Sequence, residues 1–182
     1  MVYESVKEIF ESLDEASRRF RERVEGLSEA EENLRPPSGA WSVAEIVEHV
    51  SIVEHQLFQL TSMMLMKAEA SGAKARPDKR IPPASLDQFA EHGKAKLEAP
   101  ESARPRGGVR VADSLAKMSD TRASLHSLRP RLEEADLSVV QYPHPYFGPL
   151  DLYQWLILIG AHEARHLNQI ESLIRSSEGK AN

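Results

Sequence analysis

Hydrophobic residues near the start of the chain recur at steps of three and four positions, which is the period of an amphipathic α-helix. This spacing predicts a first helix from about residue 2 to residue 27, after which Pro36 and Pro37 interrupt the chain. The repeating positions, one of them a serine, are Val6, Phe10, Leu13, Ser17, Phe20, Val24 and Leu27.

A second helix is predicted from the capping pattern Ser42-Val43-Ala44-Glu45. In such a box the N-cap serine side chain accepts a hydrogen bond from the backbone, while the glutamate reaches back to the N-cap N–H. We expect this helix to run to about residue 70. Its apolar stripe consists of Ile46, Val50, Val53, Leu57 and Leu60.

The segment 71–109 breaks the helical pattern. It contains five prolines and four glycines, which exclude one long helix and indicate an insertion or loop. Within it, Ser85-Leu86-Asp87-Gln88 could cap a shorter helix through about residue 95. Residues 74–110 carry nine Lys or Arg against five acids, so this stretch is either a solvated loop or a contact for an anionic substrate.

Helical spacing returns for a third helix, which Pro130 should kink or end, and for a fourth helix that continues to about Arg175. Residues 141–149 form a turn-rich connection between them. Strand signals are nearly absent, and each amphipathic stripe must be buried against the others. The chain is therefore predicted to be all-α, a single four-helix-bundle domain over residues 1–182. The apolar positions are Val111, Leu115, Met118, Leu125, Leu128 and Leu132, then Leu152, Trp155, Leu156, Ile159, Ile170, Leu173 and Ile174.

Composition narrows the possible functions. Hydrophobic residues make up 41% and charged residues 28% of the chain, as in a globular protein, and the acidic N-terminus does not resemble a signal peptide, so we expect a cytoplasmic location. Because there is no cysteine, any metal must be bound through nitrogen and oxygen atoms. A net charge of −5 argues against nucleic acid or an anionic membrane as partner and favours a small molecule or a protein. The apolar helix faces are compatible with a homodimer.

Two histidines of the fourth helix point to metal binding. His162 and His166 lie about 40° apart around the helix, within the arc of Trp155, Ile159 and Leu173, so both imidazoles should face the bundle interior. Imidazoles four residues apart on one helical face can share one metal ion. The alternative is that each is a hydrogen-bonded core residue, which is the more common role of a single buried histidine.

A third ligand is predicted on the second helix. His49 borders its apolar stripe, whereas His55 points to the opposite side and should be in solvent. Three histidines from two facing helices leave coordination positions free for water or substrate, as in catalytic zinc sites. His144, between two prolines, is more consistent with a turn or capping residue than with a residue lining this site.

The segment His162-Glu163-Ala164-Arg165-His166 also matches H-E-x-x-H, in which zinc proteases use the glutamate as general base. Ser172 occupies the position where one class of these proteases has its third histidine, so His49 is the better third ligand and an ordinary zinc protease is disfavoured. Glu163 nevertheless lies near the inner arc, where it could act as a base toward water activated by the ion. The alternative is an ordinary carboxylate on a helix face.

Three segments together resemble the DinB/YfiT-like family of metalloenzymes: WSVAEIVEH at 41–49, HPYFGPL at 144–150, and the stretch 155–170 that contains HEARHLNQI. The resemblance implies a four-helix bundle of up-down-down-up connectivity, with nickel, zinc or a similar ion bound by His49, His162 and His166. Some mycothiol-dependent members have a glutamate where this chain has His162, so the three-histidine version is closer to the YfiT-like branch. The basic insertion between the second and third helices departs from the compact family pattern.

The family includes thiol-dependent transferases and isomerases that use bacillithiol or mycothiol. We therefore expect one divalent metal ion that activates water or a low-molecular-weight thiol, in a hydrolase or thiol S-transferase acting on a small molecule. The alternative from another class is a non-catalytic metal-binding or stress-associated bundle protein, because the same three histidines would serve either function.

Overall fold

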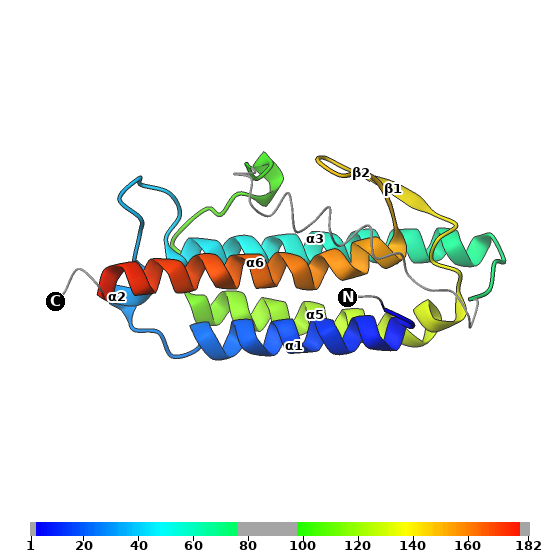
Figure 1. Ribbon diagram of the computed structural model, residues 1–182, viewed down its shortest axis with the longest axis horizontal. Coiled ribbons are helices and arrows are strands. Elements are labelled where there is room, and N and C mark those ends of the chain that lie inside the picture. The colour runs from blue at the N-terminus through cyan, green and yellow to red at the C-terminus, as the bar shows by residue number, and fades with distance from the viewer. Residues whose placement is uncertain (1–2, 76–97, 179–182) are drawn as a thin grey trace.

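In the computed structural model, which describes residues 3–75 and 98–178, four long helices lie side by side (Figure 1). Two of them, α1 and α6, run in one direction along the bundle, and α3 and α5 run in the other, so the connectivity is up-down-down-up. The predicted four-helix bundle is confirmed. The long helices are α1 (Val6–Val24), α3 (Val43–Ala70), α5 (Val111–Glu134) and α6 (Leu152–Glu178).

The parallel neighbours α3 and α5 require a long crossover, because a short turn can join only antiparallel helices. Residues 71–110 provide it, and their described part includes one short 3₁₀ helix, η1 (Glu101–Ala103). The ends of α3 and α5 lie together: the Ala75 N–H donates to the Glu134 carbonyl, and the Asp136 N–H donates to the Ala73 carbonyl. The short helix expected at 85–95 lies outside the described residues.

Local capping sets where the first helices begin. The Ser42–Glu45 capping box is present as predicted, with both reciprocal hydrogen bonds formed. The first helix is shorter than predicted, because Ser5 caps its start and the chain turns at Gly26, whose φ of 81° favours glycine. A further capping box at Ser28 starts a short helix, α2 (Glu29–Glu32), that the periodicity did not indicate.

Pro130 lies inside α5 and does not end it, so that part of the prediction was wrong, and the alternative of a kink stays a prediction. Proline removes only one helical N–H donor, and the last turn of α5 is stabilised by its surroundings. Leu132 is fully buried, and Arg131 forms two hydrogen bonds to Glu69 of α3. Packing of this turn against α3 therefore outweighs the local effect of the proline.

The predicted turn-rich connection before α6 is a β-hairpin, whose two short strands were not predicted. Strands β1 (Gln141–His144) and β2 (Gly148–Asp151) pair antiparallel, with His144 opposite Gly148. Gly148 has a φ of 74°, which allows the chain to reverse within three residues. Asp151 and Gln154 then exchange reciprocal backbone-to-side-chain hydrogen bonds and so cap the start of α6.

A polar layer crosses the middle of the bundle and divides the apolar core into two parts. On α3 the first part of the core ends at Val50 and the second begins at Leu57; on α5 the corresponding residues are Met118 and Leu125. The layer contains buried and half-buried polar and charged side chains from the four long helices. Those that bear on function are Ser17, His49, Glu54, Arg122, His162, Glu163 and His166.

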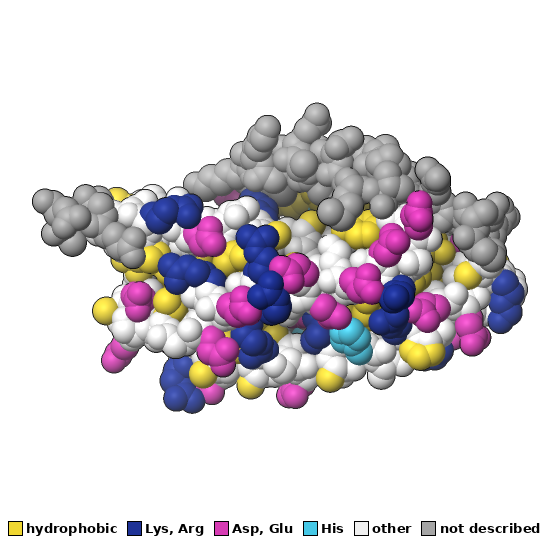
Figure 2. Space-filling model, turned by 60° about the horizontal axis from the view of Figure 1, so that its bottom comes forward, with side chains coloured by type: hydrophobic (Ala, Val, Ile, Leu, Met, Phe, Trp, Pro, Cys, Tyr) yellow, Lys and Arg dark blue, Asp and Glu magenta, His cyan; other side chains and the backbone are white. Residues whose placement is uncertain are grey.

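The outer surface is mixed in charge. Seen from the side of α1 and α5, Lys and Arg side chains alternate with Asp and Glu side chains (Figure 2). Several form ion pairs along one helix, as Arg18 does with Glu15 and Glu22. Within residues 3–75 and 98–178, none of the helices has the length and apolar character needed to cross a membrane.

Candidate metal centre

Three histidines from two helices meet in the polar layer. His49 projects from α3, and His162 and His166 project from successive turns of α6. One nitrogen atom from each of the three rings lies within 4.8 Å of the others. The ring centroids are 5.2 Å apart for His49–His162, 4.9 Å for His49–His166 and 4.5 Å for His162–His166. We call these residues the histidine triad.

The helical register predicted for α3 is confirmed by burial. His49 is 5% exposed, whereas His55, six residues later on the same helix, is exposed. On α6, His166 is 5% exposed and His162 is half-buried. The triad therefore lies mostly beneath the surface, with its partial opening at His162.

Hydrogen bonds fix the tautomers of two triad residues. His49 Nδ1 lies 2.7 Å from the Ala103 carbonyl, which can only accept, so Nδ1 carries the hydrogen and Nε2 keeps its lone pair. His166 Nδ1 lies 2.9 Å from the Gln169 side-chain oxygen, which has the same effect. His166 Nε2 is buried and has no hydrogen-bond partner among the residues that the structure describes. An unpaired buried lone pair is unfavourable, and a metal ion at this position would satisfy it.

Burial also keeps the triad neutral. Desolvation lowers the pKa of His49 and lowers that of His162 well below 6.5; it lowers the pKa of His166 to about 3. The positive charge of Arg165 lowers all three pKa values further. Neutral imidazoles are the form that binds metal ions, so the donor set fits a divalent cation.

Glu163, the predicted general base, takes part in a second group of residues that we call the carboxylate cluster: Glu54 of α3, Arg122 of α5 and Glu163 of α6. Arg122 Nη2 lies 2.7 Å from Glu54 Oε1 and 3.0 Å from Glu163 Oε2. Both carboxylates are buried, at 3% and 1% exposure. The catalytic role of Glu163 stays a prediction, because its contacts in the structure are to this cluster.

The carboxylate cluster holds two acids and one base. Burial is the main cause that raises the pKa of Glu163 to about 7; Arg122 opposes the shift, and Glu54 adds to it. Burial likewise raises the pKa of Glu54, against the effect of Arg122. The sequence contained a signal for this cluster that we did not use: Glu54 lies between Val53 and Leu57 of the apolar stripe, and Arg122 lies between Met118 and Leu125.

His144 has the turn role that its flanking prolines suggested, since its Nδ1 accepts a hydrogen bond from the Tyr146 N–H. Its ring stacks on Phe147, with the centroids 4.3 Å apart, and lies 5.2 Å from the ring of Trp155. It also lies close enough to His162 to lower the pKa of that residue. His144 therefore borders the triad from the hairpin without belonging to the group of three.

Comparisons with known proteins agree with this architecture. The family model of the DinB superfamily matches residues 12–170. The chain is 28% identical over 162 residues to the uncharacterized protein YuaE of Bacillus subtilis (strain 168), which covers 88% of this chain and 94% of YuaE. The fold of this chain is similar to that of TT2238, described as a four-helix bundle protein. The TM-score is 0.62 and the sequence identity 19%, and the match covers 91% of this chain and 98% of TT2238.

Proposed function

Because the chain belongs to the DinB superfamily, we propose that it is a metal-dependent enzyme acting on a small molecule, with one divalent ion bound by His49, His162 and His166. The observation that carries this proposal is the convergence of three neutral imidazoles within 4.8 Å, one of them with a buried nitrogen that has no protein partner. Nickel and zinc, our candidates, are among the ions that suit an all-imidazole donor set.

When bound, the ion would lower the pKa of a water molecule or a thiol in its open coordination positions. The protein residues supply binding and orientation. Ala103 and Gln169 hold Nδ1 of His49 and His166, so each presents Nε2 toward the same point. His162 is only half-buried, so we place the approach of substrate at this side of the triad.

Two reaction classes follow, hydrolysis and thiol S-transfer, with a low-molecular-weight thiol as co-substrate in the second. In either class Glu163 is our candidate for the general base, because burial raises its pKa to about 7, the range in which a carboxylate can exchange protons near neutral pH. One observation favours the alternative of a non-catalytic metal-binding protein: the Glu163 carboxylate is already paired with Arg122.

The test is metal content, measured by elemental analysis on protein purified without an affinity tag that binds metal, followed by a screen of thiol-transfer and hydrolytic substrates. We expect one nickel or zinc ion per chain and turnover with at least one substrate class. A protein with one ion that is inert in the whole screen would favour the non-catalytic alternative. A protein that binds neither ion at micromolar concentration would exclude both.

A further inference from the structure

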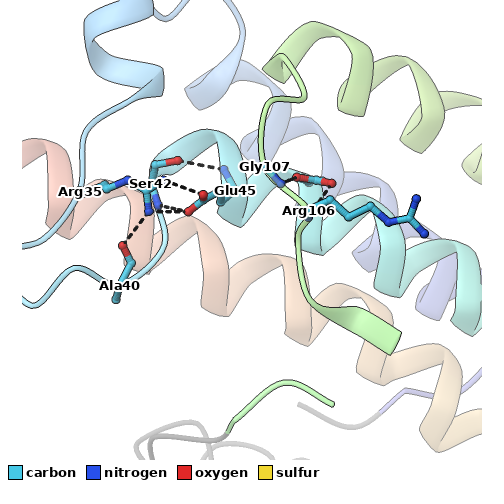
Figure 3. A network of polar contacts seen from close by, with 7 residues as sticks. Arg35, Ala40, Ser42, Glu45, Arg106 and Gly107 are labelled. Carbon is cyan, nitrogen blue, oxygen red and sulfur yellow. Dashed lines mark hydrogen bonds and ion pairs between the residues drawn. The ribbon is translucent and has the colours of Figure 1, made fainter. Parts of the chain in front are cut away.

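The end of the insertion is anchored to α3 directly beside the metal centre. Glu48, the residue before His49, is 6% exposed, and its two carboxylate oxygens accept hydrogen bonds from the Arg106 and Gly107 N–H groups, each at 3.0 Å. Figure 3 shows Arg106 and Gly107 against α3, where the main chain of the crossover passes the helix. Such bonds to an ionised carboxylate are about twice as strong as neutral ones.

The anchored segment reaches the triad through its backbone. Four residues before Gly107, the buried Ala103 of η1 accepts the hydrogen bond from His49 Nδ1 at 2.7 Å. Farther along α3, Gln56 Nε2 donates to the Ser102 carbonyl at 2.8 Å. The segment is therefore held on both sides of His49, with the Ala103 carbonyl between the two attachments.

The attachment of residues 106–107 to Glu48 requires the backbone conformation that Gly107 adopts. Gly107 has a φ of 79°, which side chains with a Cβ rarely adopt, and a Cβ at this position would lie 3.4 Å from Glu45 Oε1. Arg106 contributes its backbone N–H to Glu48 (Figure 3). Glu48 thus binds two backbone N–H groups, whose positions depend on the path of the main chain and not on the side chains of the segment.

We propose that residues 101–107 form the outer shell of the metal centre and that Glu48 is a positioning residue for His49. By holding the segment, Glu48 keeps the Ala103 carbonyl on Nδ1, which directs Nε2 of His49 to the ion. The proposal rests on the metal binding proposed above and adds a role for the insertion. The outer-shell partner of a metal-binding histidine typically contributes about 10- to 100-fold to metal affinity.

Reciprocity gives a second consequence. If the anchored segment strengthens metal binding, metal binding must stabilise the anchored segment by the same factor. The amide hydrogens of Arg106 and Gly107 should therefore exchange more slowly with solvent when zinc is added. This measurement uses the unmodified protein and does not depend on any variant folding.

The direct test compares Glu48→Gln with Glu45→Gln, measuring the zinc Kd at pH 7 by competition with a chelator. Both residues accept backbone hydrogen bonds near the start of α3, but Glu45 is bonded to Ser42 and Arg35 and holds a different loop (Figure 3). A glutamine at 48 loses one acceptor and presents an N–H to an N–H. We expect Glu48→Gln to raise the zinc Kd about 10- to 100-fold at unchanged stoichiometry, and Glu45→Gln to change it less than about threefold.

The His49 Nδ1 hydrogen supplies a spectroscopic signature, since its NMR signal should be visible in the zinc-bound protein and broaden in Glu48→Gln. Gly107→Ala, compared with Gly39→Ala in the other loop, provides a second pair if Glu48→Gln does not fold; both glycines have positive φ. Three results would overturn the outer-shell role and leave metal binding intact. They are an unchanged zinc Kd in Glu48→Gln or Gly107→Ala, an equal loss of zinc affinity in a variant and its control, and amide exchange that does not change when zinc is added. A wild-type protein without zinc affinity would instead remove the proposed function itself.

Discussion

The polar layer contains two groups of residues that differ in how their buried polar atoms are paired. The histidine triad consists of three neutral imidazoles, and among the described residues His166 Nε2 has no hydrogen-bond partner. The carboxylate cluster contains its own cation, Arg122, between two acids, Glu54 and Glu163. An added positive ion would thus complete the triad, whereas the cluster already contains a cation.

This difference gives the triad the character of a binding site and the cluster that of a buried ion-pair network within the same layer. Buried ion pairs rarely stabilise a protein more than apolar packing would, but removal of one partner is strongly destabilising. Buried neutral imidazoles can be replaced at lower cost to folding, and their loss should appear in metal binding. The two groups should therefore respond differently to substitution, to metal and to pH.

The largest effect on stability is expected for Arg122→Met. It removes the cation paired with Glu54 and Glu163, and leaves two acids buried in the bundle. Breaking a buried ion pair in this way typically costs about 3–5 kcal/mol of unfolding free energy. Urea denaturation at neutral pH, compared with the triple variant that also carries Glu54→Gln and Glu163→Gln, measures this effect. If Arg122→Met is as stable as the triple variant, the charges of the cluster do not matter for folding.

The next effect concerns the triad and should appear only when metal is present. His49→Ala, His162→Ala and His166→Ala should each lose the bound ion, whereas His55→Ala should retain it, because that side chain points into solvent. At a concentration about 100-fold above its Kd, a ligand stabilises the folded state by about 2.7 kcal/mol, so the zinc-dependent rise in melting temperature should vanish in the first three variants. Metal loss in His55→Ala together with retention in His49→Ala would show that the triad is not the site.

The pH dependence of the metal-free protein should show the two groups opposing each other. The pKa of His166 is lowered from 6.5 to about 3, so between these values the unfolded chain binds more protons, and stability falls as the pH is lowered. The pKa of Glu163 is raised from 4.5 to about 7, so in that window the folded protein binds more protons, and stability rises as the pH is lowered.

Melting temperatures measured in chelator between about pH 7 and pH 5 test this opposition. His166→Leu should reduce the loss of stability on acidification relative to wild type, and Glu163→Gln should increase it. Two variants that shift the pH dependence in the same direction would mean that one of the two pKa shifts has the wrong sign.

The sequence predicted the parts of this picture that depend on local order. The Ser42–Glu45 capping box and the opposite orientations of His49 and His55 follow from spacing along one helix, and the structure has both. Spacing shows which face of a helix a residue occupies, but it does not show which residue of another helix it meets. The pairing of Arg122 with Glu54 and Glu163 could not be derived for this reason.

The same reason explains what was missed outside the helices. Ala103 and His49 are 54 residues apart in the sequence, so the contact of the Ala103 carbonyl with His49 depends on how the chain folds between them. No local sequence pattern encodes this contact. Pro130 does not end the helix because two tertiary contacts, the packing of Leu132 and the Arg131–Glu69 pair, maintain the turn beyond it. Cytoplasmic location, homodimerisation and the small-molecule partner stay predictions.

The smallest effect on stability and metal affinity is expected for Glu163→Gln, and it addresses whether the carboxylate cluster has a catalytic role. Arg122 would still be paired with Glu54, so no buried charge is left without a partner, and the variant should remain folded, bind one metal ion and change the zinc Kd less than about threefold. Glu54→Gln is the matched control, because it leaves Arg122 paired with Glu163. If Glu163 is the base, its substitution should lower kcat by about 10²- to 10⁴-fold, with KM nearly unchanged, for the substrate that the screen identifies. Glu54→Gln should change kcat much less, since its carboxylate is not the proton acceptor. An equal loss of kcat in the two variants would mean that Glu163 acts through the Arg122 cluster. No loss of kcat in either variant would mean that both residues have a structural role.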